Sequence, residues 1–213
     1  MDIAVNLVES YLRLCGYLTA SEFDVLRRNP QGSYESATDI DVLALRIPGR
    51  IYVAGDPHGE EEGAMLSIDE DEALQLEPGL VDVIVGEVKE SEAVLNPGLR
   101  RHKVLHGVLR RLESLYGDSL LEAVESLQAR AVAYTTTKEG GQVRTRLVAF
   151  GRSPLNDLHT ISLSYIVEQM MAFFERFDEV IRPTHYKDPA PALLRLLVKS
   201  GFSVSKMQEG KVV

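Results

Sequence analysis

Residues 80–89 read Leu-Val-Asp-Val-Ile-Val-Gly-Glu-Val-Lys and carry the clearest strand signal in the chain. The run is β-branched and almost continuously apolar, which is typical of a central strand that is buried on both faces. It ends in Glu87-Val88-Lys89, and alternation along a strand places the two charged side chains on one face. An isolated buried charge is costly, so we expect both groups to be paired, solvated or bound to a metal.

A second strand is predicted over residues 38–47, Thr-Asp-Ile-Asp-Val-Leu-Ala-Leu-Arg-Ile, and it is closed by Pro48-Gly49. Neighbouring strands lie about 4.8 Å apart. If this strand pairs with the first, Asp41 and Glu87 converge on a single cation, and Lys89 projects into the same site. Two carboxylates completed by waters and phosphate oxygens are what Mg²⁺ prefers. Asp39 shares the face of Asp41, as a ligand, a support for the ligands or a turn-side residue.

Helical periodicity surrounds these two strands. Apolar residues recur at three- and four-residue spacing over residues 3–15, which predicts a helix that ends at Gly16. An extended segment over 17–26 follows. We expect further helices over 99–116, 118–128, 161–179 and 190–200, and a hairpin of strands over 129–137 and 143–150. The expected class is α/β (α+β), a central mixed β-sheet flanked by helices in one domain over 1–213 that ends in the helices of 161–200.

The acidic charge of the chain is concentrated in one segment. The formal net charge of the 213 residues is −9, and residues 55–77 hold nine carboxylates with no lysine or arginine. The rest of the chain is neutral, so nucleic acid stays open as a partner. Because like charges repel, we interpret 55–77 as an exposed insertion with at most one short helix.

Composition excludes several classes of protein. A single cysteine, Cys15, rules out an intrachain disulfide framework and a cysteine-based zinc cage. No apolar run reaches the roughly 18 residues of a membrane span, and the first residues lack the pattern of a secretory signal. We therefore expect a cytoplasmic protein with no membrane partner.

The order of these motifs resembles a known family. Asp-x-Asp-Val-Leu-Ala on one strand, an apolar strand that ends in Val-Gly-Glu-Val-Lys, and a following helix resemble the PD-(D/E)XK nuclease superfamily, which has the restriction-endonuclease-like fold. The resemblance covers about residues 3–151. It implies that Asp41 is the metal-binding aspartate, Glu87 the acidic ligand and Lys89 the catalytic lysine. The family's proline before the aspartate is replaced by Ile40.

The resemblance also extends to the first helix, where the family often carries a glutamate. Glu9 lies on that helix, nearer to its end than is usual in relatives. Its spacing from Arg13 equally predicts an i,i+4 ion pair on the helix surface. Glu9 is thus either part of the catalytic site or a partner of Arg13.

Two functions from different classes follow from the resemblance. The first is a metal-dependent nuclease that uses Mg²⁺ or Mn²⁺ and Lys89 to assist water attack on a phosphodiester, with DNA as the expected partner and RNA not excluded. The second is a non-catalytic nucleic-acid- or protein-binding module on the same fold.

Basic side chains offer candidate contacts to a phosphate backbone, although a charged face is often only solvated. The candidates on the helix of 99–116 are Arg100, Lys103, Arg110 and Arg111. Arg144 and Arg146 alternate on a strand, and they too either contact a phosphate backbone or form a solvated face. The apolar face of 161–179 suits either the core or a homodimer interface.

Overall fold

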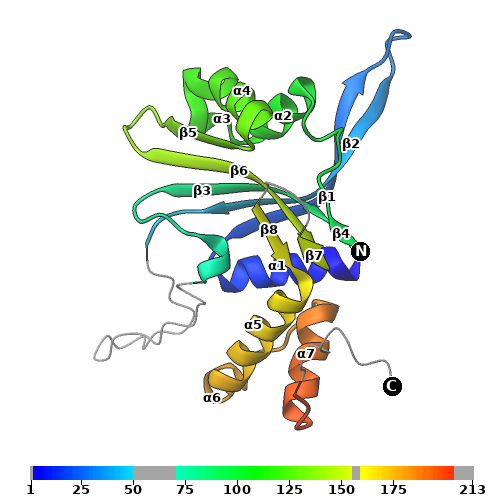
Figure 1. The fold of residues 1–213 in the computed structure, drawn as a ribbon, viewed down its shortest axis with the longest axis vertical. Helices are drawn as coiled ribbons and strands as arrows, with labels where there is room; N and C mark the ends of the chain where they lie inside the picture. The colour runs from blue at the N-terminus through cyan, green and yellow to red at the C-terminus, as the bar shows by residue number, and fades with distance from the viewer. Residues whose placement is uncertain (1, 50–70, 155–158, 204–213) are drawn as a thin grey trace.

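The structure is a computed structural model that describes residues 2–49, 71–154 and 159–203. It is a mixed α/β protein in which helices flank a curled sheet (Figure 1). The strands of the main sheet are β1 (Leu18–Arg28), β2 (Tyr34–Arg46), β3 (Val81–Val88), β5 (Val132–Thr136), β6 (Gln142–Gly151) and β8 (His159–Ser162). Their order is β1-β2-β3-β6-β5, and β8 also pairs with β6. A separate two-stranded sheet joins β4 (Glu92–Ala93) to β7 (Ser153–Pro154).

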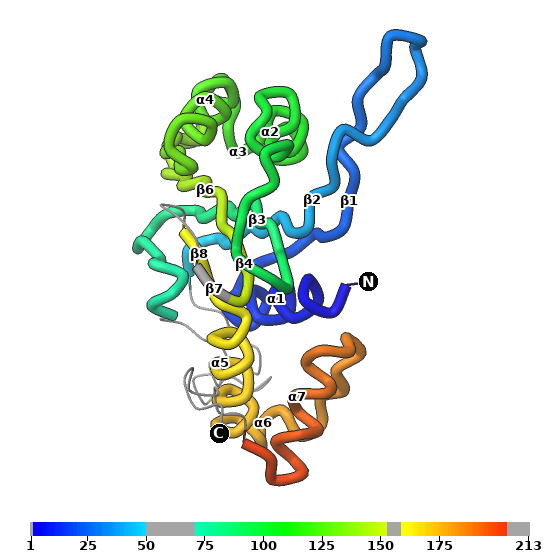
Figure 2. Tube along the Cα trace, turned by 45° about the vertical axis from the view of Figure 1, so that its right-hand side comes forward, coloured from blue at the N-terminus to red at the C-terminus, as the bar shows by residue number. Residues whose placement is uncertain are grey.

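The helices form two groups, one on each side of the main sheet (Figures 1 and 2). One group comprises α2 (His102–Leu109), α3 (Glu113–Tyr116) and α4 (Leu120–Arg130). The other comprises α1 (Ile3–Leu14), α5 (Leu163–Arg176), α6 (Asp178–Ile181) and α7 (Pro189–Lys199). None of the helices within the described ranges has both the length and the apolar character needed to cross a membrane.

The central position predicted for residues 80–89 is confirmed. Strand β3 pairs antiparallel with β2 and parallel with β6, so both of its edges are hydrogen-bonded. Its apolar side chains supply two cores: Ile84 and Val88 pack on the side of α1, and Val83 and Val85 pack on the side of α2 and α4. Burial on both faces explains why the run is apolar without alternation.

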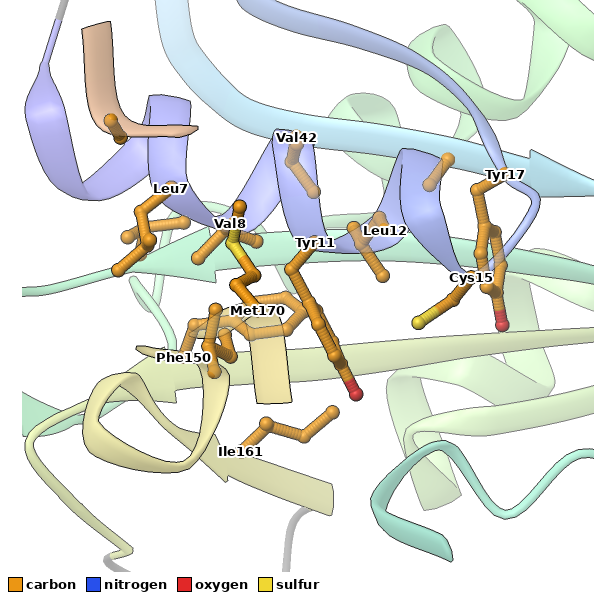
Figure 3. Packing of buried hydrophobic residues seen from close by; sticks show 14 of the residues in the cluster. Leu7, Val8, Tyr11, Leu12, Cys15, Tyr17, Val42, Phe150, Ile161 and Met170 are labelled. Carbon is orange, nitrogen blue, oxygen red and sulfur yellow. The ribbon is translucent and has the colours of Figure 1, made fainter. Parts of the chain in front are cut away.

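Helix α1 is as predicted and packs directly on the sheet. Asp2 caps its first turn, since the Asp2 Oδ1 accepts from the backbone N–H of Ala4 at 2.7 Å. Gly16, with a φ of +85°, ends it in the left-handed conformation that glycine adopts without strain. Figure 3 shows Tyr11 and other residues of α1 between β2 and the segment that leads into α5.

The helix predicted over 99–116 is not continuous. It divides into α2, a 3-10 turn over Arg110–Leu112 and α3. At this turn Arg111 lies over the Phe23 ring, 3.9 Å from its centroid, and the chain then brings the Tyr116 hydroxyl to 2.8 Å from Thr145 Oγ1. These contacts to the sheet outweigh helical periodicity, which is only a local preference.

Two other boundaries also differ from the prediction. The first two residues of the helix predicted over 161–179 belong instead to strand β8. The Ser162 hydroxyl accepts from the Tyr165 N–H and caps α5, so this helix begins at Leu163. The strand predicted from residue 129 begins at Val132, after Ala131 ends α4 with a φ of +59°. The hairpin of β5 and β6 is antiparallel, as predicted.

Strands β1 and β2 extend beyond the sheet as a projecting arm (Figure 2). The arm makes β2 four residues longer at its start than predicted, and pairing continues to Arg28 opposite Tyr34. Its outer part is exposed, including the apolar side chains of Leu26 and Tyr34. Because exposed strand residues bury little apolar surface, the sequence pattern underestimates this length.

Most of the acidic segment predicted as an insertion, residues 55–70, lies outside the described residues. Its last part is not simply solvated. Asp71 is buried, caps a 3-10 turn over Glu72–Leu74 and accepts a hydrogen bond of 2.8 Å from the Tyr165 hydroxyl.

Candidate active site

The register of β2 against β3 brings the two predicted metal ligands together. Val42 lies opposite Gly86 and Leu43 opposite Val85, so the next step of the antiparallel ladder places Asp41 opposite Glu87. Leu43 and Val85 face the core under α2 and α4. Alternation therefore turns both carboxylates toward that same side of the sheet. The pairing of these strands, which the sequence analysis made a condition of the site, is confirmed.

Lys89 completes the group. Its Nζ lies 2.6 Å from Glu87 Oε1 and 4.0 Å from Asp41 Oδ2. The Val88 backbone N–H donates to the same Asp41 oxygen at 2.7 Å, which fixes that carboxylate against the end of β3. The Glu87 side chain is buried whereas that of Lys89 is partly exposed, so the site opens to solvent on the lysine side.

Gly86 lies where the side chains of β2 and β6 leave no space for a Cβ. A Cβ at this position would lie 2.7 Å from Val42 Cγ1 and 2.9 Å from Phe150 Cε2, distances that real Cβ atoms do not show. Only glycine lets the side chains of β2 and β6 close over β3 at this point. Gly86 thus allows close packing on the face of the sheet that lies opposite Asp41 and Glu87.

Burial dominates the electrostatics of the two carboxylates despite the nearby ammonium of Lys89. Burial raises the pKa of Asp41, and the Val88 N–H and Lys89 offset this only in part. Burial, and then the charge of Asp41, likewise raise the pKa of Glu87 against the opposing contact with Lys89. Burial lowers the pKa of Lys89, but the contact with Glu87 and the charge of Asp41 outweigh it and leave that pKa raised.

The donor set suits a hard divalent cation. The contacts found within the described ranges use Asp41 Oδ2 and Glu87 Oε1, which leaves the second oxygen of each carboxylate as a candidate ligand. No three acidic, histidine or cysteine side chains of the described residues are grouped so as to hold a metal. Two protein carboxylates are nevertheless a usual set for Mg²⁺, which retains waters and takes further oxygens from substrate phosphates.

Asp39 lies near the site without joining it. Its side chain is exposed, and its negative charge contributes to the raised pKa of both Asp41 and Glu87. We therefore interpret Asp39 as a neighbouring charge that makes the site more negative and favours the binding of a cation.

Glu9 is not grouped with Asp41 and Glu87. Its Oε1 is 3.0 Å from Arg13 Nη2, so the predicted i,i+4 pair is present, but the Glu9 side chain is buried and does not lie on the helix surface as expected. Arg13 also binds Asp188 at 2.9 Å, which ties α1 to the start of α7. Helix α1 packs against Val42 and Ala44, on the sheet face opposite the site.

The basic residues predicted on 99–116 are all exposed: Arg100, Lys103, Arg110 and Arg111. They lie on α2 or its flanks, on the same side of the sheet as Asp41 and Glu87. The segment before α2 contacts β2, where Asn96 Nδ2 donates to Thr38 Oγ1 at 3.4 Å. Arg110 lies 3.8 Å from Glu113, and Arg111 also donates to the Asp24 carbonyl.

Arg144 and Arg146 do not form an exposed basic surface. Both are buried, because Arg144 Nε donates to Asp82 Oδ1 at 2.6 Å and Arg146 Nη2 donates to Asp82 Oδ2 at 2.8 Å. Both alternatives left by the sequence, contact with a phosphate backbone and a solvated charged face, assumed exposed arginines, and the structure matches neither.

The buried cluster around Asp82 was missed in the sequence analysis. The Tyr17 hydroxyl also donates to Asp82, at 2.6 Å, and His159 accepts from Arg146 at 2.7 Å. The signal was present as one carboxylate within the apolar run of 80–89 and two alternating arginines on a second strand, a pattern that predicts a buried ion pair.

The sequence matches no family model, and neither a curated protein nor a solved structure was found to be significantly similar to this chain.

Proposed function

We propose that this protein is a metal-dependent nuclease with a restriction-endonuclease-like fold. The observation that carries the proposal is the meeting of Asp41, Glu87 and Lys89 from two adjacent strands. The fold is supported by the succession of α1, the antiparallel strands β1, β2 and β3, the helices α2 to α4, and β6, which is parallel to β3. Strand β5 precedes β6 in the chain and lies at the edge of the sheet. The exposed basic residues around α2 support a polyanionic substrate on this side of the sheet.

Each of the three residues has a distinct role in the proposed reaction. Asp41 and Glu87 would hold Mg²⁺ or Mn²⁺, and the bound ion would supply positive charge near the phosphoryl oxygens and the attacking water. Asp41 is kept in place by the Val88 N–H. Glu87 orients Lys89 through their contact of 2.6 Å.

Lys89 is the group that reaches solvent and therefore substrate. Its raised pKa keeps the amine protonated at neutral pH, so it donates a hydrogen bond rather than removing a proton. From the partly exposed edge of the site the ammonium orients the attacking water or offsets charge on the phosphate.

The test is cleavage of plasmid DNA, single-stranded DNA and RNA with Mg²⁺ or Mn²⁺. We expect Lys89→Ala to reduce the rate by about 10²–10³-fold, the loss typical of one charge-stabilising donor. Lys103→Ala, on an exposed face of α2, serves as the matched control and should affect substrate binding rather than turnover. Unchanged cleavage by Lys89→Ala would remove Lys89 from the mechanism.

Metal binding separates the nuclease from a non-catalytic module. We expect calorimetry with Mn²⁺ to show binding by the wild type and its loss in Asp41→Asn and Glu87→Gln. If the wild type binds nucleic acid but neither binds Mn²⁺ nor cleaves, the protein is a binding module instead.

A further inference from the structure

A pocket of about 290 Å³ lies in a notch at the edge of the main sheet. Strand β5 pairs with β6 as far as Val132 opposite Arg146, and β8 begins its pairing at Val148 opposite His159. Between the two strands the edge of β6 is not covered by a full strand, although the Leu147 N–H donates to the Ala131 carbonyl at 2.8 Å. The polar groups lining the notch are those of Gln75, Glu77, Arg130, Tyr134, Arg144, Arg146 and His159.

The base of this pocket is a fixed pair of arginines. The side chains of Arg144 and Arg146 are only 6% and 5% exposed, and Asp82 holds both from beneath. Arg146 Nη1 donates to His159 Nδ1 at 2.7 Å, so that nitrogen carries no proton, and His159 Nε2 donates to the Ala73 carbonyl at 2.6 Å. Burial and the charge of Arg146 lower the pKa of His159, which keeps the ring neutral. The two guanidinium groups are therefore rigidly placed.

One side of Arg144 lacks an acceptor. Its Nη1 donates to the Gln75 carbonyl at 2.7 Å and to Glu77 Oε1 at 2.9 Å. Its Nη2 is buried with no hydrogen-bond partner in the described part of the chain. Burying a guanidinium nitrogen without an acceptor costs free energy. An oxyanion with two adjacent oxygens could accept from Nη1 and Nη2 of Arg144 together.

Glu77 already places one carboxylate in this pocket. Its Oε1 accepts from both Arg144 and the Tyr134 hydroxyl, the latter at 2.7 Å. The Glu77 side chain is 41% exposed, so it can leave the pocket at little cost in buried surface. Arg130 also lines the pocket, and in the described residues its guanidinium donates only to Ser126 Oγ.

We propose that this pocket binds a small ligand through a carboxylate or phosphate group, which takes the place that the Glu77 carboxylate occupies. Arg144 and Tyr134 bind the anionic group, and Arg130 adds positive charge at the rim. The pocket volume is close to the lower end of the roughly 300–1,000 Å³ that is typical of small-molecule sites, which suits a metabolite or a mononucleotide.

This site is separate from the proposed nuclease centre. Asp82 and Glu87 are five residues apart on β3, so they lie on opposite faces of the sheet and about 16 Å apart along the strand. The inference therefore does not rest on the nuclease proposal, and either can fail alone.

The experiment is calorimetric titration with inorganic phosphate, citrate and adenosine monophosphate at constant ionic strength. Phosphate and citrate distinguish the two anionic groups, and the nucleotide tests whether a larger body fits. If the Glu77 carboxylate occupies the anion position beside Arg144 in nine of ten molecules, Glu77→Gln should raise the apparent affinity for the anionic probe about tenfold. Glu72→Gln, an exposed acid on the same segment, should leave the affinity unchanged.

Two milder variants locate the ligand without disturbing the buried pair. Tyr134→Phe and Arg130→Ala, both at exposed positions, should weaken binding in the Glu77→Gln background. Thermal unfolding of each variant shows that it remains folded. Absence of saturable binding of all three probes to Glu77→Gln at millimolar concentration overturns the proposal, as does binding that neither milder variant weakens.

Discussion

Strand β3 carries two buried carboxylates that have opposite electrostatic surroundings. Asp82 and Glu87 are each 3% exposed. The pKa of Asp82 is lowered, because Arg146, Arg144 and the Tyr17 hydroxyl outweigh the effect of burial. The pKa of Glu87 is raised, because burial and the nearby Asp41 outweigh Lys89. We call the Asp82 cluster complete because two arginines within the protein balance the charge of that carboxylate. We call the Glu87 cluster incomplete because Lys89 alone faces the two carboxylates of Glu87 and Asp41.

The largest effect is expected at the complete cluster. Asp82→Asn leaves two buried guanidinium groups without their shared counter-charge. Removing one partner of a buried ion pair typically costs about 3–5 kcal/mol. Denaturant unfolding measures this loss, with Asp39→Asn as an exposed control. A loss below about 1 kcal/mol would show that the arginines find other partners and would contradict the comparison.

The same cluster predicts a dependence on pH. Because the folded-state pKa of Asp82 is lowered, its stabilisation is present above the unfolded pKa of about 3.9 and is lost as the pH falls through the folded value. The free energy of unfolding of the wild type should therefore fall more steeply in acid than that of Asp82→Asn. Equal slopes below about pH 4 would show that Asp82 is not the group responsible.

The next largest effect on stability is expected at Gly86, where side chains of β2 and β6 pack against β3. Gly86→Ala places a methyl group against Val42 and Phe150, and overpacking of this kind costs about 1–3 kcal/mol. The displaced side chains lie on the sheet face opposite Asp41 and Glu87, so Mn²⁺ binding should change less than stability. Gly107→Ala in α2 is the control, since its Cβ would meet only the Val25 side chain, at 3.1 Å, and alanine favours the helix. Similar stability of the two variants would show that the strands accommodate the methyl group.

At the incomplete cluster, removal of the carboxylate charge is expected to raise the stability of the protein rather than lower it. Glu87→Gln removes a buried negative charge whose ionisation is unfavourable in the folded state, since its pKa is raised. Without metal at neutral pH, we expect the variant to be more stable than the wild type. A gain of about 1 kcal/mol corresponds to a rise of roughly 2–4 °C in Tm for a chain of this size. A lower Tm would show that Lys89 fully compensates Glu87.

Added Mn²⁺ should then reverse the order of the two proteins. A cation that binds the folded state stabilises the wild type by mass action, and it has no site in Glu87→Gln. Scanning calorimetry with and without Mn²⁺ gives both comparisons in one series.

The sequence predicted the candidate site better than the boundaries of the helices. Asp41, Glu87 and Lys89 could be grouped because alternation along a strand is regular and β3 is marked by an unbroken apolar run. The Asp82 cluster could not be assembled in the same way, since its partners come from the turn between α1 and β1 and from β6 and β8. The division of 99–116 depends on contacts of Arg111 and Tyr116 with the sheet, which local periodicity does not contain.

The smallest effect is expected at Glu9, where the family resemblance and the geometry differ. The Glu9 side chain is only 4% exposed, whereas that of Arg13 is 45% exposed, so solvent screens only the arginine end of this ion pair. Glu9→Gln retains a hydrogen-bond acceptor for Arg13 and leaves no buried charge, so we expect a change in stability of about 1 kcal/mol or less and unchanged Mn²⁺ affinity. Arg13→Ala distinguishes the two roles, because it breaks the pair without removing a carboxylate. A loss of Mn²⁺ binding in Glu9→Gln but not in Arg13→Ala would place Glu9 among the metal ligands after all.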